Sequence, residues 1–257
     1  MNRIIHLDLP KEWDKAEIYA LSDLHRGDAF MDLPLFYRFR DHILAEPYRY
    51  VLCIGDLTNN ATKNSVSNVY NEQISPSQQR KWLKKELYPL RERIKIIIPG
   101  NHEYRTIKES DVDITEDLAD ALGISEYFRP EEAVLKVTLG RGKNGKKVCY
   151  TIYCVHGAGG GGTAGGALNR VVSLSNSIDC DIYIMGHVHK KIAHKDVFRR
   201  VDLRNNIVTD DNERLYVTSS SYTSFGGYAA RGMFRPSAKG SVPISLSGTE
   251  KNFTAKV

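Results

Sequence analysis

The stretch YVLCIGDLTNN, residues 50–60, passes from a short apolar segment directly into a turn of glycine, aspartate and asparagine. Its first half, residues 50–54, has the composition and length of a buried strand. Its second half combines residues that let a chain turn sharply with side chains that bind cations. The stretch therefore predicts a strand that ends in a polar turn with metal-type ligands.

The same design recurs on both sides of this stretch. Residues 16–21 are apolar and end in SDLHRGD, and residues 94–98 are apolar and end in PGNHE. Between these strands, apolar spacing predicts helices at 33–44 and at 78–93, the second begun by Ser75 and Pro76. Strands that alternate with helices are typical of an α/β fold.

The second half of the chain changes character. It predicts a short helix at 115–123 capped by Thr115, strands at 133–139 and 147–155, and a hairpin turn at Asn144-Gly145. A helix at 167–176 and a strand at 181–185 that ends in GHVH follow, and the chain from residue 192 is mostly β, with a turn in TDDNER. Hairpins after alternating strands and helices predict an α/β layered fold with two sheets.

Composition sets the broad class. The chain has 257 residues with 41% hydrophobic residues and a formal net charge of +5, which permits an anionic substrate without proving nucleic-acid binding. No apolar run is long enough to span a membrane. The four cysteines form no CxxC pair, and we interpret Cys53, Cys149, Cys154 and Cys180 as reduced core residues. This cysteine usage predicts a cytoplasmic protein.

Metal-type side chains follow every predicted strand of the α/β part. They are Asp23, His25, Asp56, Asn101, His102, His156, His187 and His189. Ligands in such sheets gather beyond the carboxyl ends of the strands, so the five turns should converge on one place. We expect Asp23 and His25, two residues apart in an extended segment, to reach the same ion.

Each motif has an ordinary alternative when it stands alone. A single DxH or GNH sequence is more often a polar turn than a metal site, and so is a lone GHxH. All five motifs nevertheless occur in one chain, each at the end of an apolar run, and a chance match of the whole set is improbable.

The ordered set DLH, GDLTN, GNHE, VHG and GHVH, between Asp23 and His189, resembles the calcineurin-like metallophosphoesterase superfamily. The resemblance implies a four-layer sandwich of two mixed β-sheets flanked by helices. We expect a single domain over residues 1–257, with a motif core at 16–190 and a β-rich part at 191–257. The resemblance also implies two divalent metal ions. We expect Mn²⁺, with iron, zinc or a mixture as alternatives.

The resemblance also implies the role of each side chain. One ion would be held by Asp23, His25, Asp56 and His189, and the second by Asp56, Asn101, His156 and His187, so that Asp56 bridges the pair. A metal-bridging hydroxide would attack phosphorus, and His102 would protonate the leaving oxygen. The alternative for His102 is that it only packs or orients Asp23. Tentative substrate contacts are Arg26, Asn59, Asn60 and Arg105.

The substrate is less determined. Protein phosphatases of this superfamily carry an arginine where this chain has Asn60, and Asn59 replaces a second aspartate. The sequence therefore favours a phosphodiesterase acting on nucleic acid or nucleotides. A phosphomonoesterase acting on phosphoprotein or metabolite is the alternative, and a non-catalytic scaffold is the third interpretation. We expect a phosphate-ester partner and no membrane partner. The oligomeric state stays open, and so do the roles of the glycine-rich segment 157–166 and of the β-rich C-terminal stretch, including 222–235, which could cap the site or form an interface.

Overall fold

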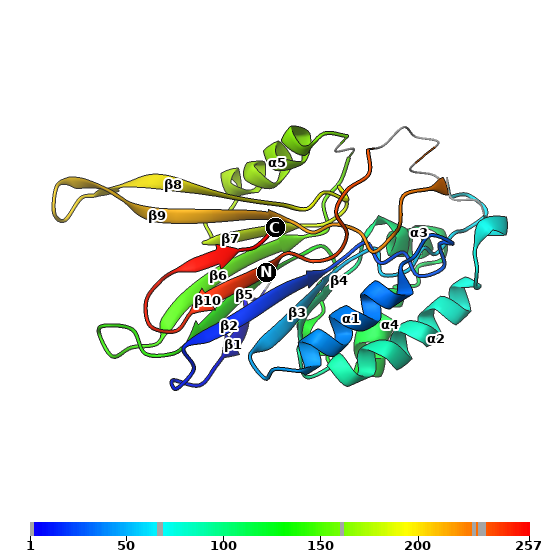
Figure 1. The fold of residues 1–257 in the computed structure, drawn as a ribbon, viewed down its shortest axis with the longest axis horizontal. Coiled ribbons are helices and arrows are strands. Elements are labelled where there is room, and N and C mark those ends of the chain that lie inside the picture. Colours follow the sequence, from blue (N-terminus) through cyan, green and yellow to red (C-terminus); the bar gives the residue numbers. More distant parts are fainter. Residues whose placement is uncertain (1–2, 66–68, 160–161, 228–229, 231–234) are drawn as a thin grey trace.

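The computed structural model describes residues 3–65, 69–159, 162–227, 230 and 235–257. Two mixed β-sheets lie face to face, with helices on both outer sides (Figure 1), which confirms the predicted α/β fold class. The glycine-rich segment at 157–166 and the stretch at 222–235, whose roles the sequence left open, lie partly outside the described residues.

The smaller sheet has five strands in the order β11-β10-β2-β3-β4. Their bounds are β2 Lys15–Leu21, β3 Arg49–Ile54, β4 Ile94–Ile98, β10 Pro243–Ser247 and β11 Phe253–Ala255. The strands β2, β3 and β4 run parallel, while β10 pairs antiparallel with both β2 and β11. The three strands predicted from the N-terminal motifs are therefore adjacent, and their carboxyl ends share one edge.

The larger sheet has six strands in the order β1-β5-β6-β7-β9-β8. Their bounds are β1 Ile5–Asp8, β5 Glu132–Leu139, β6 Val148–Val155, β7 Ile182–Met185, β8 Ile192–Asp202 and β9 Ile207–Thr218. The strands β6 and β7 are parallel neighbours, so the turns that follow them also lie together. The sequence did not predict β1.

The α-helices include α1 Leu33–Leu44, α2 Pro76–Leu87, α3 Asn101–Ser110, α4 Ile114–Leu122 and α5 Ala164–Ser173. Short 3₁₀ turns cover Val69–Asn71, Tyr88–Leu90, Ser125–Tyr127 and Leu174–Asn176. Helices α1, α2 and α4 cover the five-stranded sheet, and α5 covers the six-stranded sheet. None of the described helices is long and apolar enough to cross a bilayer.

Alternating side chains on the two sheets explain the core. Inward-facing residues of both sheets, such as Ile18, Leu52, Leu135 and Ile184, form one buried cluster between them. Each such side chain contributes about 1.5–3 kcal/mol when it leaves water. Phe36, Leu83 and other helix residues form a second cluster on the outer face of the smaller sheet. This packing fixes the sheets rigidly enough to position the turns at their edge.

Several local predictions are wrong. Asp113, not Thr115, caps α4, because its carboxylate accepts the N–H groups of Thr115 and Glu116. The predicted helix at 78–93 ends at Leu87 and continues only as a 3₁₀ turn. The helix predicted at 167–176 begins earlier, at Ala164, with Thr163 as its cap.

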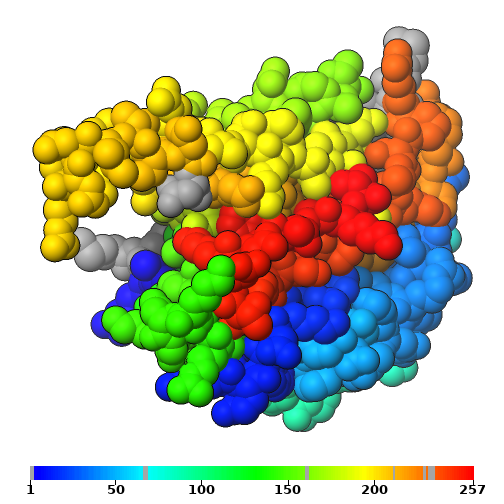
Figure 2. Space-filling view, turned by 60° about the vertical axis from the view of Figure 1, so that its left-hand side comes forward, coloured from blue at the N-terminus to red at the C-terminus, as the bar shows by residue number. Residues whose placement is uncertain are grey.

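The long hairpin of β8 and β9 was also mispredicted. The segment TDDNER, at 209–214, lies inside β9 rather than in a turn, and the chain reverses between Asp202 and Ile207. The hairpin extends away from the body of the molecule, as the yellow and orange arm of Figure 2 shows. Its outer half exposes Val201 and Leu203, at 69% and 83% of their surface. Turn-type residues can thus occupy a strand where pairing with the neighbouring strand decides the conformation.

The interpretation of the cysteines holds for three of the four. Cys53, Cys154 and Cys180 are buried, whereas Cys149 is exposed. In β6 the burial alternates at this position, so that Val148 and Tyr150 face the core and Cys149 faces solvent. An apolar segment therefore did not reveal which face of the strand would be covered.

Candidate metal centre

The predicted ligands come together at one edge of the two sheets. Each lies just after the carboxyl end of a strand: β2 leads to Asp23 and His25, β3 to Asp56, and β4 to Asn101. The strands β6 and β7 lead to His156 and to His187 and His189, respectively. Five of the eight histidines of the chain, with His102 included, occupy this edge. The expected convergence of the five turns is thus present.

One group of side chains consists of Asp23, His25 and His189. The Nε2 atom of His189 lies 3.1 Å from Oδ1 of Asp23 and 3.2 Å from Nε2 of His25. Nε2 of His25 lies 3.9 Å from the same carboxylate oxygen. Metal–ligand bonds of about 2.1 Å place neighbouring ligand atoms roughly 3–4 Å apart, so these separations suit one ion.

A second group consists of Asp56, His156 and His187. Nε2 of His156 lies 3.3 Å from Oδ2 of Asp56 and 3.1 Å from Oδ1 of Asn101. Oδ1 of Asn101 lies 2.8 Å from Nδ1 of His187. The amide oxygen of Asn101 therefore completes a set of four donors from four different turns.

Asp56 lies between the two groups. Its Oδ2 atom is 3.3 Å from Nε2 of His156 in one group and 4.0 Å from Nε2 of His25 in the other. The side chain is almost fully buried, with 2% of its surface exposed. This position matches the bridging place that the sequence resemblance implies.

The backbone of the turns departs from the extended form expected for Asp23 and His25. Both residues have positive φ, at 52° and 47°, and so do Asp56, His187 and His189. Residues other than glycine rarely adopt this left-handed region, which costs of order 1 kcal/mol or more for each residue. The tight turns, rather than strand alternation, therefore aim these side chains at one point.

Two glycines allow the turns after β3 and β4 to touch. A Cβ atom on Gly55 would lie 2.6 Å from the backbone of Gly100 and 2.7 Å from Nδ1 of His156. A Cβ atom on Gly100 would lie 2.3 Å from the Asp56 carboxylate. Any side chain at either position would push the two turns apart, so the motifs GD and GNH need their glycines for close approach.

Burial and neighbouring charge act against each other at this edge. Burial raises the pKa of Asp23, but His189 more than offsets it and holds the pKa below its ordinary value. Burial lowers the pKa of His156, yet the Asp56 carboxylate dominates and raises it to about 10. Neither carboxylate forms an ion pair with a lysine or arginine of the described residues. The charged partners of these two buried carboxylates are imidazoles alone, beside the backbone N–H groups of His102 and His187, which favours a cation among them.

His102 lies beside this cluster, and a hydrogen bond from its Nδ1 atom fixes the orientation of the ring. Nδ1 is 2.8 Å from the carbonyl oxygen of Asn59, to which it donates, and the backbone N–H of His102 donates to Oδ1 of Asp56. The free nitrogen Nε2 lies 3.8 Å from Oδ2 of Asp56. His25, Asp56 and His102 also lie close enough to one another to form a third metal-type group. The position of His102 therefore suits either a proton donor or a metal ligand.

Sequence reasoning missed Glu103, which is 97% buried behind the turns. Its carboxylate accepts the backbone N–H groups of Asp56, Thr58 and Gly100 at 2.8–2.9 Å, and also the hydroxyl of Thr58. It thereby locks together the turns that follow β3 and β4. The signal was the glutamate three residues after Gly100, because a glutamate at the third position of a helix often accepts the N–H of the capping residue.

The four tentative substrate residues turn mainly toward the protein. The amide of Asn59 donates to Glu72, and that of Asn60 donates to the carbonyl oxygen of His102. Arg105 donates to the carbonyl oxygen of Asn59. Arg26 is buried, and its guanidinium lies 5.1 Å from the ring centre of Trp82. Among the described residues, Asn59 and Asn60 form no hydrogen bond with Asn101.

The donor set fits divalent cations. Imidazole, carboxylate and amide donors suit borderline ions such as Mn²⁺, Fe²⁺ and Zn²⁺ better than an all-oxygen calcium site. Nδ1 of His156 donates to the carbonyl oxygen of Ile54 at 2.8 Å, which leaves Nε2 free to act as a ligand. The described residues thus contain His/Asp groups that can hold divalent metals.

The solved structures that resemble this chain do so at low sequence identity. Among proteins with curated descriptions, none matches the sequence significantly. Vps29 of Chaetomium thermophilum aligns at 13% identity and a TM-score of 0.42, with 94% of each chain covered. A putative 5'-nucleotidase of Staphylococcus aureus aligns at 11% identity and a TM-score of 0.48, over 94% of this chain and 53% of its own. These likenesses assign no activity.

A calcineurin-like phosphoesterase of Bacillus subtilis aligns at 11% identity and a TM-score of 0.42, over 94% of this chain and 90% of its own. A sequence profile described as calcineurin-like phosphoesterase matches residues 16–191. The match covers all five motifs and well over half of the sequence. The chain therefore belongs to the calcineurin-like phosphoesterase family.

Proposed function

We propose that the protein hydrolyses phosphate esters with two divalent metal ions, and that its preferred substrates are phosphodiesters in nucleic acid or nucleotides. The observation that carries the proposal is the place of Asp56, a buried carboxylate between two groups of nitrogen and oxygen donors. Two-metal phosphatases and nucleases hold their ions about 3.5–4 Å apart, and a carboxylate shared between two donor groups would keep two ions that close.

In this proposal Asp23, His25 and His189 hold one ion and Asn101, His156 and His187 hold the other, with Asp56 shared. Mn²⁺ is the ion we expect in both positions. When bound, a divalent pair supplies charge stabilisation at the phosphoryl oxygens and activates a water molecule for attack on phosphorus. The protein's own contribution is to fix the donors, and Glu103 does so by holding the backbone of the Asp56 turn.

His102 is the proposed proton donor. Its Nδ1–H group stays bound to the carbonyl oxygen of Asn59, so the ring is oriented with Nε2 toward the cluster. Protonated at Nε2, it would deliver a proton to the leaving alkoxide oxygen as the ester bond breaks. The alkoxide that leaves from a nucleic-acid diester is a strong base, so a positioned acid is valuable there.

The exposure of the site supports a substrate larger than a single phosphate. Asp23, Asp56 and His156 form a buried floor, whereas His189 retains 42% of its side-chain surface and Asn101 is exposed. Solvent therefore reaches the donors from one side. We also propose a reducing compartment such as the cytoplasm, which the four free cysteines support.

A direct comparison of two chromogenic esters tests the substrate class. The purified protein with Mn²⁺ is incubated with bis-p-nitrophenyl phosphate and with p-nitrophenyl phosphate, and Asp56→Asn serves as the inactive control. We expect faster turnover of the diester. Faster turnover of the monoester would instead support a phosphomonoesterase, and no turnover of either by a metal-loaded protein would support a scaffold.

A second experiment separates a polymer from a small substrate. Binding of a labelled single-stranded oligonucleotide is measured with the Asp56→Asn protein across a range of salt concentrations. Each phosphate contact that replaces counterions steepens the fall of affinity with salt, with a slope of about −0.7 per contact for a single strand. A flat salt dependence would contradict the nucleic-acid part of the proposal and leave a nucleotide as substrate.

A further inference from the structure

A cavity of about 180 Å³ lies between α2 and α4, behind the turn that carries Asp56. The two helices run side by side on the outer face of the five-stranded sheet (Figure 1). None of the predicted metal ligands lines the cavity. Its wall toward the metal centre is formed by Thr58 and Glu103, so the cavity is a separate space.

The floor of the cavity is apolar. Leu57, Leu83, Ile114 and Leu118 all line it, and each has 4% or less of its surface exposed. An engineered apolar cavity of roughly 150 Å³ in another protein accepts benzene. An apolar ligand group of about one six-membered ring therefore fits the volume of the cavity and the apolar side chains of its floor.

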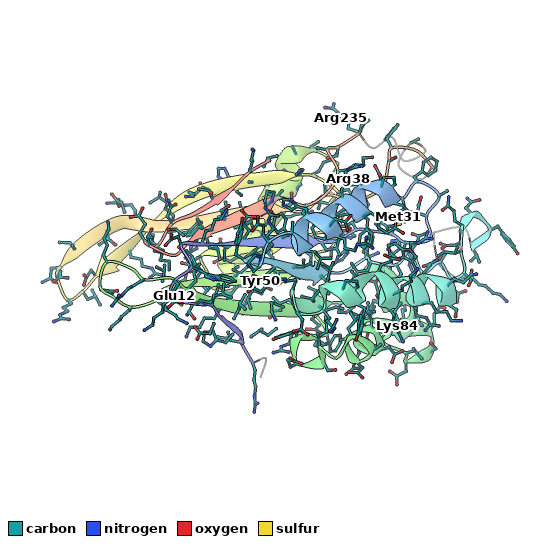
Figure 3. The ribbon with its side chains drawn as sticks, turned by 60° about the horizontal axis from the view of Figure 1, so that its bottom comes forward. Glu12, Met31, Arg38, Tyr50, Lys84 and Arg235 are labelled. Carbon is teal, nitrogen blue, oxygen red and sulfur yellow. The ribbon has the colours of Figure 1, made fainter. Side chains whose placement is uncertain are left out.

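The rim of the cavity is basic. Arg80, Lys81 and Lys84 line it from α2, and none of them forms an ion pair with the described residues. Figure 3 shows Lys84 where α2 runs beside α4. Asp117 on α4 also lies on the rim, but the three cations outnumber it. The carboxylate of Glu103 is already engaged by the N–H groups of the metal-site turns.

One polar atom in the wall of the cavity lacks a partner. The hydroxyl of Thr115 is buried and has no hydrogen-bond partner among the described residues, and the residue lines the cavity while exposing only 2% of its surface. A buried hydroxyl without a partner costs of order 1–3 kcal/mol. A ligand with an acceptor oxygen would remove this cost.

We infer that this cavity is a second binding site, which takes a small monoanion with a one-ring apolar body, such as an aromatic carboxylate. The leucines and Ile114 cover the ring, the cations of α2 attract the negative charge, and Thr115 donates to an acceptor oxygen. The inference does not depend on the proposed hydrolysis, because it rests on residues outside the metal centre.

Benzoate and its neutral analogue benzyl alcohol test the inference. The full-length protein is labelled at leucine and isoleucine methyl groups, and each compound is titrated while NMR shifts are recorded. We expect benzoate to shift the signals of Leu83, Ile114 and Leu118 with saturation, and benzyl alcohol to do so more weakly. Failure of benzoate to shift these signals, or equal affinity of both compounds, overturns the inference.

Variants on the rim test the charge contribution without touching the core. In the double variant Lys81→Gln/Lys84→Gln, benzoate should bind roughly tenfold more weakly, since two exposed cations each contribute up to about fivefold. Benzyl alcohol should be unaffected. Lys85→Gln is the matched control, because Lys85 lies on the same helix and does not line the cavity. Unchanged benzoate affinity in the double variant overturns the assignment of an anion.

The Thr115 hydroxyl is tested by the near-isosteric change Thr115→Val. The unliganded variant should melt at the same temperature or higher, because it loses a buried hydroxyl without a partner. Benzoate affinity should fall several-fold. A lower melting temperature together with unchanged benzoate affinity would show that the hydroxyl serves the fold rather than a ligand, and would overturn this part of the inference.

Discussion

Asp56 and His102 illustrate how closely the proposed roles depend on single atoms. The backbone N–H of His102 donates to Oδ1 of Asp56, while its Nε2 atom lies 3.8 Å from Oδ2 of the same carboxylate. The backbone contact survives any change of the side chain at position 102. Loss of the imidazole should therefore spare the bridging aspartate.

We predict that His102→Ala keeps its metal and loses activity. The rate of diester hydrolysis should fall by about 10²–10⁴-fold, because a general acid contributes that much to catalysis. Metal content is measured by mass spectrometry, and activity with a dinucleotide, whose leaving alkoxide needs a proton. His194→Ala is the control, since His194 lies on β8 and pairs with Asp196. Loss of metal in His102→Ala would make this residue a ligand rather than a proton donor.

Glu103 is the residue through which the fold holds the site. We predict that Glu103→Gln destabilises the protein by about 2–4 kcal/mol and weakens Mn²⁺ binding by about 10–100-fold, because it replaces charge-assisted hydrogen bonds to three backbone N–H groups. Urea unfolding and calorimetric titration measure the two effects. Glu109→Gln on the same helix should change neither quantity, because the Glu109 carboxylate accepts only the hydroxyl of Thr62 among the hydrogen bonds of the described residues. Normal metal affinity in Glu103→Gln would contradict the supporting role.

At the scale of elements, the pairing of β2 with β3 carries a partly buried charge pair. Glu17 and Arg49 are register partners, and Nε of Arg49 donates to Oε2 of Glu17 at 2.8 Å. The hydroxyl of Tyr19 donates to the same oxygen. Burial raises the pKa of Glu17, but these donors outweigh it and lower the pKa below its ordinary value.

This pair predicts a pH-dependent contribution to stability. Because the folded-state pKa of Glu17 is lowered, the contribution is present above the unfolded value of about 4.3 and is lost as pH falls through the folded value. Glu17→Gln should therefore cost about 1 kcal/mol at pH 7 and nearly nothing at about pH 3. Urea unfolding at both pH values measures the difference. The exposed Glu12→Gln is the control, and an equal cost at both pH values would contradict the prediction.

Elements marked by a clear apolar segment were predicted well, and elements without such a segment were not. The strands β3 and β4 appear within one residue of their predicted bounds, because continuous apolar segments flanked by turns leave little choice. Helix α3 was missed, because only Glu103 of its ten residues is buried and no apolar stripe marks it. The position of the β8–β9 turn was missed because strand pairing outweighed the local turn composition of TDDNER.

At the scale of the whole molecule, metal binding should be coupled to folding. The ligands come from both sheets, and the two sheets share one core, so an ion bound only by the folded state stabilises everything together. We predict that Mn²⁺ at about 100 times its Kd raises the melting temperature by about 5–10 °C, in a single transition. Differential scanning calorimetry with and without chelator measures this shift. Asp56→Asn should lose the shift, and two separate transitions would contradict the expectation of a single domain.

The sequence by itself determined the α/β class and the order of the ligand-bearing turns, because a buried strand and the turn after it are encoded by neighbouring residues. Only the tertiary structure decided which ligands meet. His189 reaches Asp23 across 166 residues, and this contact depends on sheet order and on left-handed turns that no local pattern reveals. The same holds for the contact of Glu103 with the Asp56 turn and for the cavity between α2 and α4. Both arise where separate elements pack, and packing is a property of the whole chain.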